Sequence, residues 1–132
     1  MRKKILVVDD DADLVELIRF NRTQAGYAIG TASNGVEAIK KARSWQPDLI
    51  VLDIMMPELD GFAVCEILRR DPATAGIPIM MLTALSSELG RMAGLGSGAN
   101  DFVTKPFSPR ILVQRIEELL QKTSNIPQTT AH

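Results

Sequence analysis

Acidic side chains directly follow two apolar runs of the chain. Asp9 and Asp10 come after residues 5–8, and Asp53 comes after residues 49–52. A carboxylate at the end of a buried strand is costly to desolvate unless it meets a cation or leaves the core at that point. With no His or Cys nearby, such a group of hard oxygen ligands favours Mg²⁺ over zinc. The three aspartates therefore predict a Mg²⁺ site, provided that the ends of their strands meet.

A hydroxyl and an ammonium group follow two further apolar segments. Thr83 comes after residues 79–82, and Lys105 comes shortly after the pair Phe102–Val103. A pocket for a phosphoryl group needs cations to neutralise its oxygens and a hydroxyl to donate a hydrogen bond. We therefore expect Asp53 to be a phosphoryl acceptor, and the other residues to serve it.

The elements that must position these residues are strands and helices in alternation. The apolar runs 5–8, 49–52 and 79–82 contain no polar residue, which is typical of strands covered on both faces. Residues 28–32 are partly polar, as an edge strand often is, and residues 102–103 predict a short last strand.

Helices are expected between the strands and after the last one. The signals are Gly26 as a stop, an Asn34–Glu37 capping box, a turn at Asp60–Gly61, a start near Ser86, and a Ser108–Pro109 N-terminus. Apolar residues at helical spacing are expected to face the sheet, among them Val64, Ile67, Leu68, Ile111, Leu112 and Ile116.

Five strands alternating with five helices predict an α/β domain with a doubly wound parallel sheet. Right-handed crossovers and the two-sided burial of three strands favour the strand order 2-1-3-4-5, with strands counted in chain order. In such a sheet ligands bind outside the carboxyl ends of the strands. The acidic, hydroxyl and lysine side chains are therefore expected to meet at one edge.

Size and composition limit the function further. The chain of 132 residues is long enough for one core, and its 15 basic and 16 acidic residues offer no overall attraction to nucleic acid or an anionic membrane. Cys65 is the only cysteine, so no disulfide framework is expected. No apolar run reaches the length of a membrane span, which predicts a cytoplasmic protein. Residues 1–122 form the expected domain, and residues 123–132 are polar and aperiodic, as in a flexible tail or a truncated linker.

Four stretches of the chain resemble the motifs of response-regulator receiver domains of two-component signalling. They are ILVVDDD, LIVLDIMMPELDG, IMMLTA and NDFVTKPF, and they match in order and spacing from about Lys4 to Leu120. The resemblance implies a flavodoxin-like, chemotaxis-receiver-like fold. It also implies that Asp53 takes a phosphoryl group from the phosphohistidine of a sensor histidine kinase or a phosphotransfer protein.

The resemblance assigns roles in metal binding. Asp10 would bind Mg²⁺ directly and Asp9 through water, with Asp53 and the carbonyl group of Met55 completing the site.

The resemblance also assigns roles in phosphoryl binding and switching. Lys105 would contact the phosphoryl group, Thr83 would be the switch hydroxyl, and Phe102 the switch aromatic, at a position where the family often has tyrosine. The surface formed by the helix from Ser86, the last strand and the helix after Ser108 would change, and a partner or a second copy is expected to dock there.

Three other functions were weighed. Haloacid-dehalogenase-like phosphohydrolases also use an aspartate at a strand end, but they place a second, proton-donating Asp where this chain has Met55. A receiver-like module that is never phosphorylated would lack an acidic, Thr or Lys member of the site, and none is missing. A nucleotide-binding domain is disfavoured because the first strand leads into aspartates rather than a glycine-rich loop. The chain is thus expected to catalyse no reaction beyond the gain and loss of its own phosphoryl group.

Overall fold

A computed structural model was obtained for the chain, and it describes residues 3–9, 16, 26–54, 59–83, 96, 98–104 and 108–130, with the backbone alone at 109 and from 122 on. The elements within these residues are β1 (Lys4–Val8), β2 (Ala28–Ala32), α2 (Gly35–Trp45), β3 (Leu49–Asp53), α3 (Gly61–Arg70), β4 (Ile79–Thr83), β5 (Asp101–Thr104) and α5 (Pro109–Thr130). The two remaining predicted helices, expected before Gly26 and from Ser86, lie outside the described residues apart from Glu16 and Gly96.

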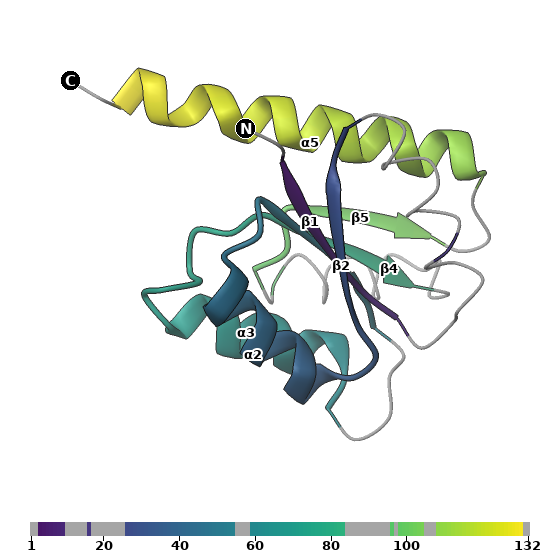
Figure 1. Cartoon of the computed structure of the whole chain (residues 1–132), viewed down its shortest axis with the longest axis vertical. Helices are drawn as coiled ribbons and strands as arrows, with labels where there is room; N and C mark the ends of the chain where they lie inside the picture. Colours follow the sequence, from purple (N-terminus) through teal and green to yellow (C-terminus); the bar gives the residue numbers. More distant parts are fainter. Residues whose placement is uncertain are drawn as a thin grey trace.

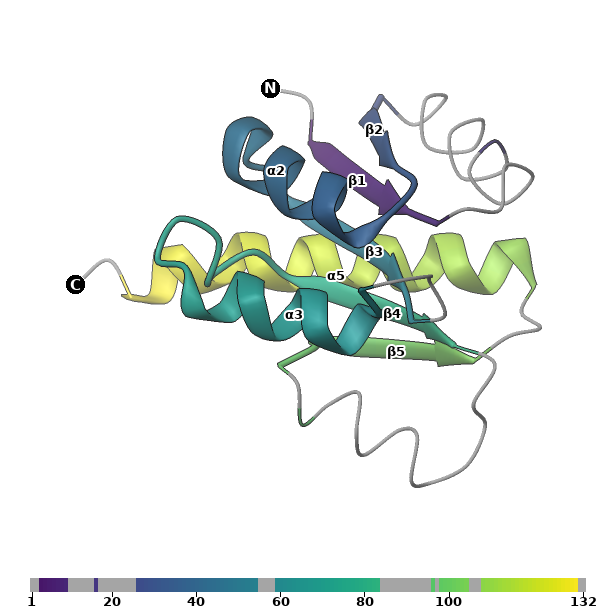
Figure 2. The same ribbon diagram turned by 90° about the horizontal axis from the view of Figure 1, so that it is seen from below.

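The five strands form one parallel sheet in the order β2-β1-β3-β4-β5, as predicted (Figure 1). The three strands that contain the apolar runs, β1, β3 and β4, take the central positions. There each strand has a neighbour on both sides and is covered on both faces. The partly polar β2 forms one edge and the short β5 the other (Figure 2).

Helices cover both faces of the sheet. α2 and α3 lie on one face and α5 crosses the other (Figures 1 and 2). Alternate residues of each strand point to opposite faces, so two apolar clusters form. We call them the α2/α3 face, which contains Leu6, Ile50 and Met81, and the α5 face, which contains Val7 and Val51.

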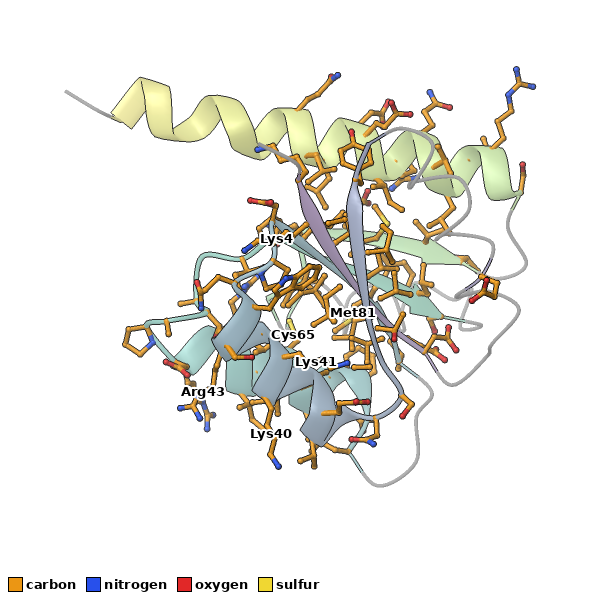
Figure 3. The ribbon with its side chains drawn as sticks, viewed as in Figure 1. Lys4, Lys40, Lys41, Arg43, Cys65 and Met81 are labelled. Atoms are coloured by element: carbon orange, nitrogen blue, oxygen red, sulfur yellow. The ribbon has the colours of Figure 1, made fainter. Side chains whose placement is uncertain are left out.

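The α2/α3 face is closed by side chains from both helices. Cys65 of α3 and Met81 of β4 lie between the helices and the sheet, whereas Lys40 and Arg43 point away from α2 (Figure 3). Cys65 is fully buried, as its spacing to Leu68 predicts, and it acts there as a small apolar side chain.

The predicted starts of α2 and α3 are present. Asn34 Oδ1 accepts a hydrogen bond from the Glu37 amide at 2.9 Å, and the Glu37 carboxylate accepts one at 2.8 Å from the amide of Ser33. Asp60 caps α3 by accepting from the Ala63 amide at 2.9 Å. Asn34 and Asp60 thus pair amides that the first turn of a helix leaves without an intrahelical partner, and Glu37 pairs the amide of the residue before the cap.

Two predicted helix positions are wrong. Ile67 on α3 is 41% exposed and Ile111 on α5 is 46% exposed, although both were expected to face the sheet. Each precedes a buried leucine, Leu68 or Leu112, and successive residues of a helix differ by about 100° in direction. The leucine takes the inward direction, and the isoleucine is turned to the flank.

The last helix extends past the predicted domain boundary. The backbone of α5 continues to Thr130, through the polar and aperiodic segment from residue 123. Extending an existing helix by one residue costs far less than starting one, which permits a polar segment to continue it. The domain boundary at residue 122 stays a prediction. In the part of the chain that the structure describes, no helix combines the length and apolarity needed to span a membrane.

Candidate functional site

The ends of β1 and β3 bring two aspartates together. The strands are paired up to Val8 and Leu52, and one step further the same register places Asp9 beside Asp53. The Asp9 amide donates to the Ala32 carbonyl at 3.2 Å, so β1 keeps its pairing with β2 at this point. Neighbouring strands lie about 4.8 Å apart. The two carboxylates therefore occupy adjacent positions at the carboxyl edge of the sheet.

Both aspartates are buried, each with only 3% of its surface exposed. Asp9 alternates with Val7, and Asp53 alternates with Val51, so both belong to the α5 face. Two neighbouring ionised carboxylates repel each other, and burial strengthens the repulsion unless positive charge or hydrogen-bond donors offset it. A bound cation would offset this repulsion, so the arrangement suits a cation site.

Thr83 lies on the next strand but on the opposite face. Asp53 pairs with Leu82, and the Ile54 amide donates to the Leu82 carbonyl at 3.0 Å, which places Thr83 one step beyond Asp53. Thr83 is fully buried and alternates with Met81 of the α2/α3 face. Thr83 is thus one residue beyond the position that pairs with Asp53, and it lies on the α2/α3 face of the sheet.

Phe102 shares that face with Thr83. It pairs with Met81 in the β4–β5 register, and Thr83 pairs with Thr104 two residues later. Phe102 is half-buried and packs against the α2/α3 cluster. The two residues predicted to switch therefore lie on adjacent strands and on one side of the sheet.

The turn after β3 is held by a close backbone approach at Gly61. The Gly61 amide donates to the Ile54 carbonyl at 3.1 Å. A Cβ atom at this glycine would lie 2.7 Å from Ile54 Cα and 2.8 Å from the carbonyl oxygen of Asp53. The start of α3 is therefore packed directly on the residue expected to accept the phosphoryl group.

Of the predicted site the structure describes Asp9 and Asp53, at adjacent positions on one face of the sheet, and Thr83 and Phe102, on the other face. Asp10, Met55 and Lys105 lie outside the described residues. Within the described part no group of three His, Cys, Asp or Glu side chains is arranged to hold a metal. Asp9 and Asp53 nevertheless place two carboxylates at adjacent positions. Their oxygens are hard ligands, and this donor chemistry fits Mg²⁺.

Two features were missed by the sequence analysis. The sequence marks Gly61 as a turn residue, but gives no sign of its contact with Asp53. Arg69 looks like an ordinary basic residue at a helix end, yet its guanidinium binds Gly98 and Asn100, which are 29 and 31 residues away. No local pattern encodes such distant hydrogen bonds.

Fold and site together define a class of protein. This is a doubly wound α/β domain with buried carboxylates at the ends of two central strands, where such sheets bind ligands. Residues 5–117 match the response regulator receiver domain. The chain belongs to this family, whose function is to accept a phosphoryl group in two-component signalling, and the resemblance stated from the motifs is confirmed.

Curated relatives support the assignment. The chain is 44% identical over 129 residues to the DNA-binding dual master transcriptional regulator RpaA of a Synechocystis strain, covering 98% of this chain and 54% of that protein. It is 49% identical over 123 residues to the alkaline phosphatase synthesis transcriptional regulatory protein PhoP of Bacillus subtilis, covering 93% of this chain and 50% of that protein. The chain thus spans about half the length of these relatives.

Solved structures give the same fold. A putative response regulator from Chloroflexus aurantiacus aligns with a TM-score of 0.85 at 36% identity, over 92% of this chain and 99% of that one. The chemotaxis response regulator CheY4 of Vibrio cholerae aligns with a TM-score of 0.83 at 31% identity, over 89% of this chain and 98% of that one. The doubly wound, flavodoxin-like fold predicted from the sequence is therefore confirmed.

Proposed function

We propose that this chain is a phosphorylation switch in which Asp53 accepts the phosphoryl group. The observation that carries the proposal is the burial of Asp53 beside Asp9, at the carboxyl end of the central strand β3. A carboxylate that only capped a turn would not need a second buried carboxylate next to it. Family membership supplies the class of reaction, and the site supplies the residue.

The donor is a phosphohistidine on a sensor histidine kinase or a phosphotransfer protein. One Asp53 carboxylate oxygen forms a bond to phosphorus while the bond from phosphorus to the donor imidazole nitrogen breaks, and the imidazole leaves with the electron pair. The product is an acyl phosphate on Asp53. The chain otherwise catalyses only the hydrolysis of this group.

The proposed Mg²⁺ site uses Asp9, Asp10, Asp53 and the carbonyl group of Met55. Mg²⁺ would neutralise charge on the carboxylates and on the oxygens of the transferred group. Asp9 and Asp53 hold their positions through strand pairing, so the chain can offer both carboxylates without rearranging the sheet. Lys105, which follows β5 directly, is the proposed cation on the other side of the phosphoryl group.

Thr83 and Phe102 are the proposed switch pair. Once phosphoryl oxygens are present, the Thr83 hydroxyl donates to them, since it has only one proton to give. Phe102 packs on the same face and fills the space that this rotation leaves. The affected surface comprises the segment from Ser86, β5 and α5, and we propose it as the docking surface for a partner or a second copy.

Net charge and composition bear on the partners. A formal net charge of -1 gives no overall attraction to nucleic acid, so we assign no direct nucleic-acid contact to this segment. A cytoplasmic location belongs to the same proposal, because the kinase must reach Asp53 with its phosphohistidine.

The test is phosphorylation by acetyl phosphate in the presence of Mg²⁺, read by intact-protein mass spectrometry. The wild-type chain should gain one phosphoryl group, and Asp53→Asn should gain none. Asp71→Asn is the matched control, because Asp71 is an aspartate that pairs with Arg43 at 2.6 Å just beyond the last residue of α3. Equal modification of Asp53→Asn would overturn the assignment.

The metal is tested separately with the same reagent. Chelation with EDTA should stop phosphorylation, and Asp10→Ala should weaken Mg²⁺ binding measured by NMR titration. An Asp10→Ala variant that binds Mg²⁺ with unchanged affinity would show that the metal site is misplaced.

A further inference from the structure

Arg69, at the end of α3, binds four oxygen atoms in two separate segments of the chain. Its Nε donates to the Gly98 carbonyl at 2.9 Å, and one terminal nitrogen donates to the carbonyls of Ala75 and Ile77 at 3.1 and 2.7 Å. The other terminal nitrogen donates to Asn100 Oδ1 at 2.7 Å. Only the planar fork of arginine can reach such a set, because a lysine offers one nitrogen.

Asn100 links Arg69 to the sheet by hydrogen bonds. Its Oδ1 also accepts from the Ile79 amide at 2.9 Å, and its own amide donates to the Ile79 carbonyl at 2.8 Å. Both partners of Oδ1 are donors, which fixes the orientation of the side-chain amide. Asn100 thus joins the residue before β5 to the first residue of β4, and Arg69 holds Asn100 in place.

The backbone conformation of Gly98 and its lack of a side chain permit the contact with Arg69. Its φ of +104° favours glycine, and a Cβ atom there would lie 2.9 Å from Arg69 Cγ. Arg69 therefore packs against Gly98 and also binds its carbonyl group. The segment that enters β5 is bound at Gly98 and at Asn100, two residues apart.

β5 depends on such contacts more than the other strands. It has four residues and lies at the edge of the sheet, paired only with β4 (Figure 2). On the opposite face, Arg115 of α5 forms an ion pair with Asp101, the first residue of β5. The start of β5 is thus held from both layers, by Arg69 through Asn100 and by Arg115 through Asp101.

The register of β5 decides which residues reach the proposed site. A shift by one residue would exchange the faces of Phe102 and Val103 and would move the residue that follows Thr104. We propose that Arg69 is a positioning residue for phosphoryl acceptance, because it fixes this register and hence the position from which Lys105 and Phe102 act. The inference rests on the proposed function of Asp53.

Arg69 acts at the far end of the strand. Asn100 directly precedes β5, and Thr104 at the other end of the strand is four residues away, about 13 Å along a strand. The proposed metal carboxylates are Asp53, on β3, and Asp9, just after β1, and the hydrogen bonds of Arg69 described above go to other residues. A loss of Arg69 should therefore separate two properties, phosphoryl transfer and Mg²⁺ binding, that general loosening of the fold would weaken together.

The experiment compares wild type with Arg69→Ala, Asn100→Ala and the double variant. Arg70→Ala is the matched control, since Arg70 is the next residue of the same helix and is exposed. The initial rate of Asp53 phosphorylation by acetyl phosphate is measured at saturating Mg²⁺, and the Mg²⁺ dissociation constant is measured by NMR titration. Circular dichroism establishes that each variant is folded.

We expect Arg69→Ala and Asn100→Ala each to slow phosphorylation about tenfold, as misplaced groups in a reaction site do. Mg²⁺ affinity should stay within about twofold, and the double variant should be no slower than either single one, because both act through one contact. Arg70→Ala should match wild type.

Two results would overturn the inference: a wild-type rate in Arg69→Ala, or a Mg²⁺ affinity that falls by the same factor as the rate. Should Arg69→Ala fail to fold, Arg69→Lys and Asn100→Ala decide by the same two measurements. If wild type itself accepts no phosphoryl group, the proposed function of Asp53 fails instead, so the two failures are distinguishable.

Discussion

Gly61 lies directly against Asp53: a Cβ atom on the glycine would be 2.8 Å from the aspartate's carbonyl oxygen. Because the obstructing atoms belong to the backbone, no side-chain rotation can make room. At Gly61 the main chains of α3 and of the end of β3 are thus in direct contact, and the position of the Asp53 backbone depends on the absence of a side chain at residue 61.

We predict that Gly61→Ala destabilises the fold by about 1–3 kcal/mol, the usual cost of overpacking. It should also slow phosphorylation of Asp53, because the end of β3 must shift. Urea denaturation and acetyl phosphate labelling provide the two measurements. Gly76→Ala is the control: a Cβ atom there meets nothing within 4 Å, so stability should change by no more than about 0.5 kcal/mol. Equal stabilities of the two variants would contradict the prediction.

The contacts of Glu37 at the start of α2 make the free energy of unfolding depend on pH. The Ser33 amide, and then Lys41, lower the pKa of Glu37 from its ordinary value of 4.5. A carboxylate with a lowered pKa stabilises the folded state above its ordinary pKa, and this contribution is lost as the pH falls through the lowered value.

Glu37→Gln should therefore cost about 0.5–1 kcal/mol at pH 7, in the range of a helix cap, and less at pH 3, where part of this contribution is lost. Asn34→Ala is the matched control, since it removes a neutral acceptor of the same helix start and its cost should be similar at both pH values. Urea denaturation at each pH measures both. An unchanged cost of Glu37→Gln at pH 3 would rule out this explanation.

The switch should be visible at β5. When a beryllofluoride analogue occupies Asp53, amide exchange at Phe102–Thr104 should slow, because Phe102 gains apolar burial of about 1–3 kcal/mol. Thr83→Ala should still bind the analogue but lose this change. Thr74→Ala is the control, because the Thr74 hydroxyl is also buried but donates to the Leu68 carbonyl at 2.7 Å on α3. No change at β5 with Asp53 occupied would exclude a switch of this kind.

The lifetime of the phosphoryl group should depend on the residue two positions after Asp53. Met55 offers no hydrogen bond to a water molecule, and the residue itself lies outside the described part of the chain. Met55→Asn adds a group that can orient an attacking water, so dephosphorylation should accelerate by about tenfold. Mass spectrometry after removal of acetyl phosphate measures it, with Met56→Asn for comparison. An equal or longer lifetime in Met55→Asn would refute the argument.

Local patterns were sufficient to predict the sheet and its strand order, whereas the roles of the residues at its carboxyl edge stay predictions. Strands such as β3 are apolar throughout and end at a polar residue, so their burial, parallel order and functional edge can all be predicted together. The same patterns did not distinguish the exposed Ile67 from the buried Leu68. In a helix with a broad apolar stripe, the sequence does not show which residue marks the edge of the stripe. Contacts such as Arg69 with Asn100 depend on tertiary distances and leave no periodic signal.

The two apolar clusters of the sheet differ in when the chain can complete them. The buried residues of the α2/α3 face run from Leu6 to Met81. All of them have therefore been synthesised well before α5. The α5 face joins Ile5 to Leu120, so one of its walls waits until almost the whole domain has left the ribosome. Contacts between distant residues form late because a long loop must be closed first. We infer that, among the described residues, the wall that α5 contributes to this face is the last part of the core to form during synthesis.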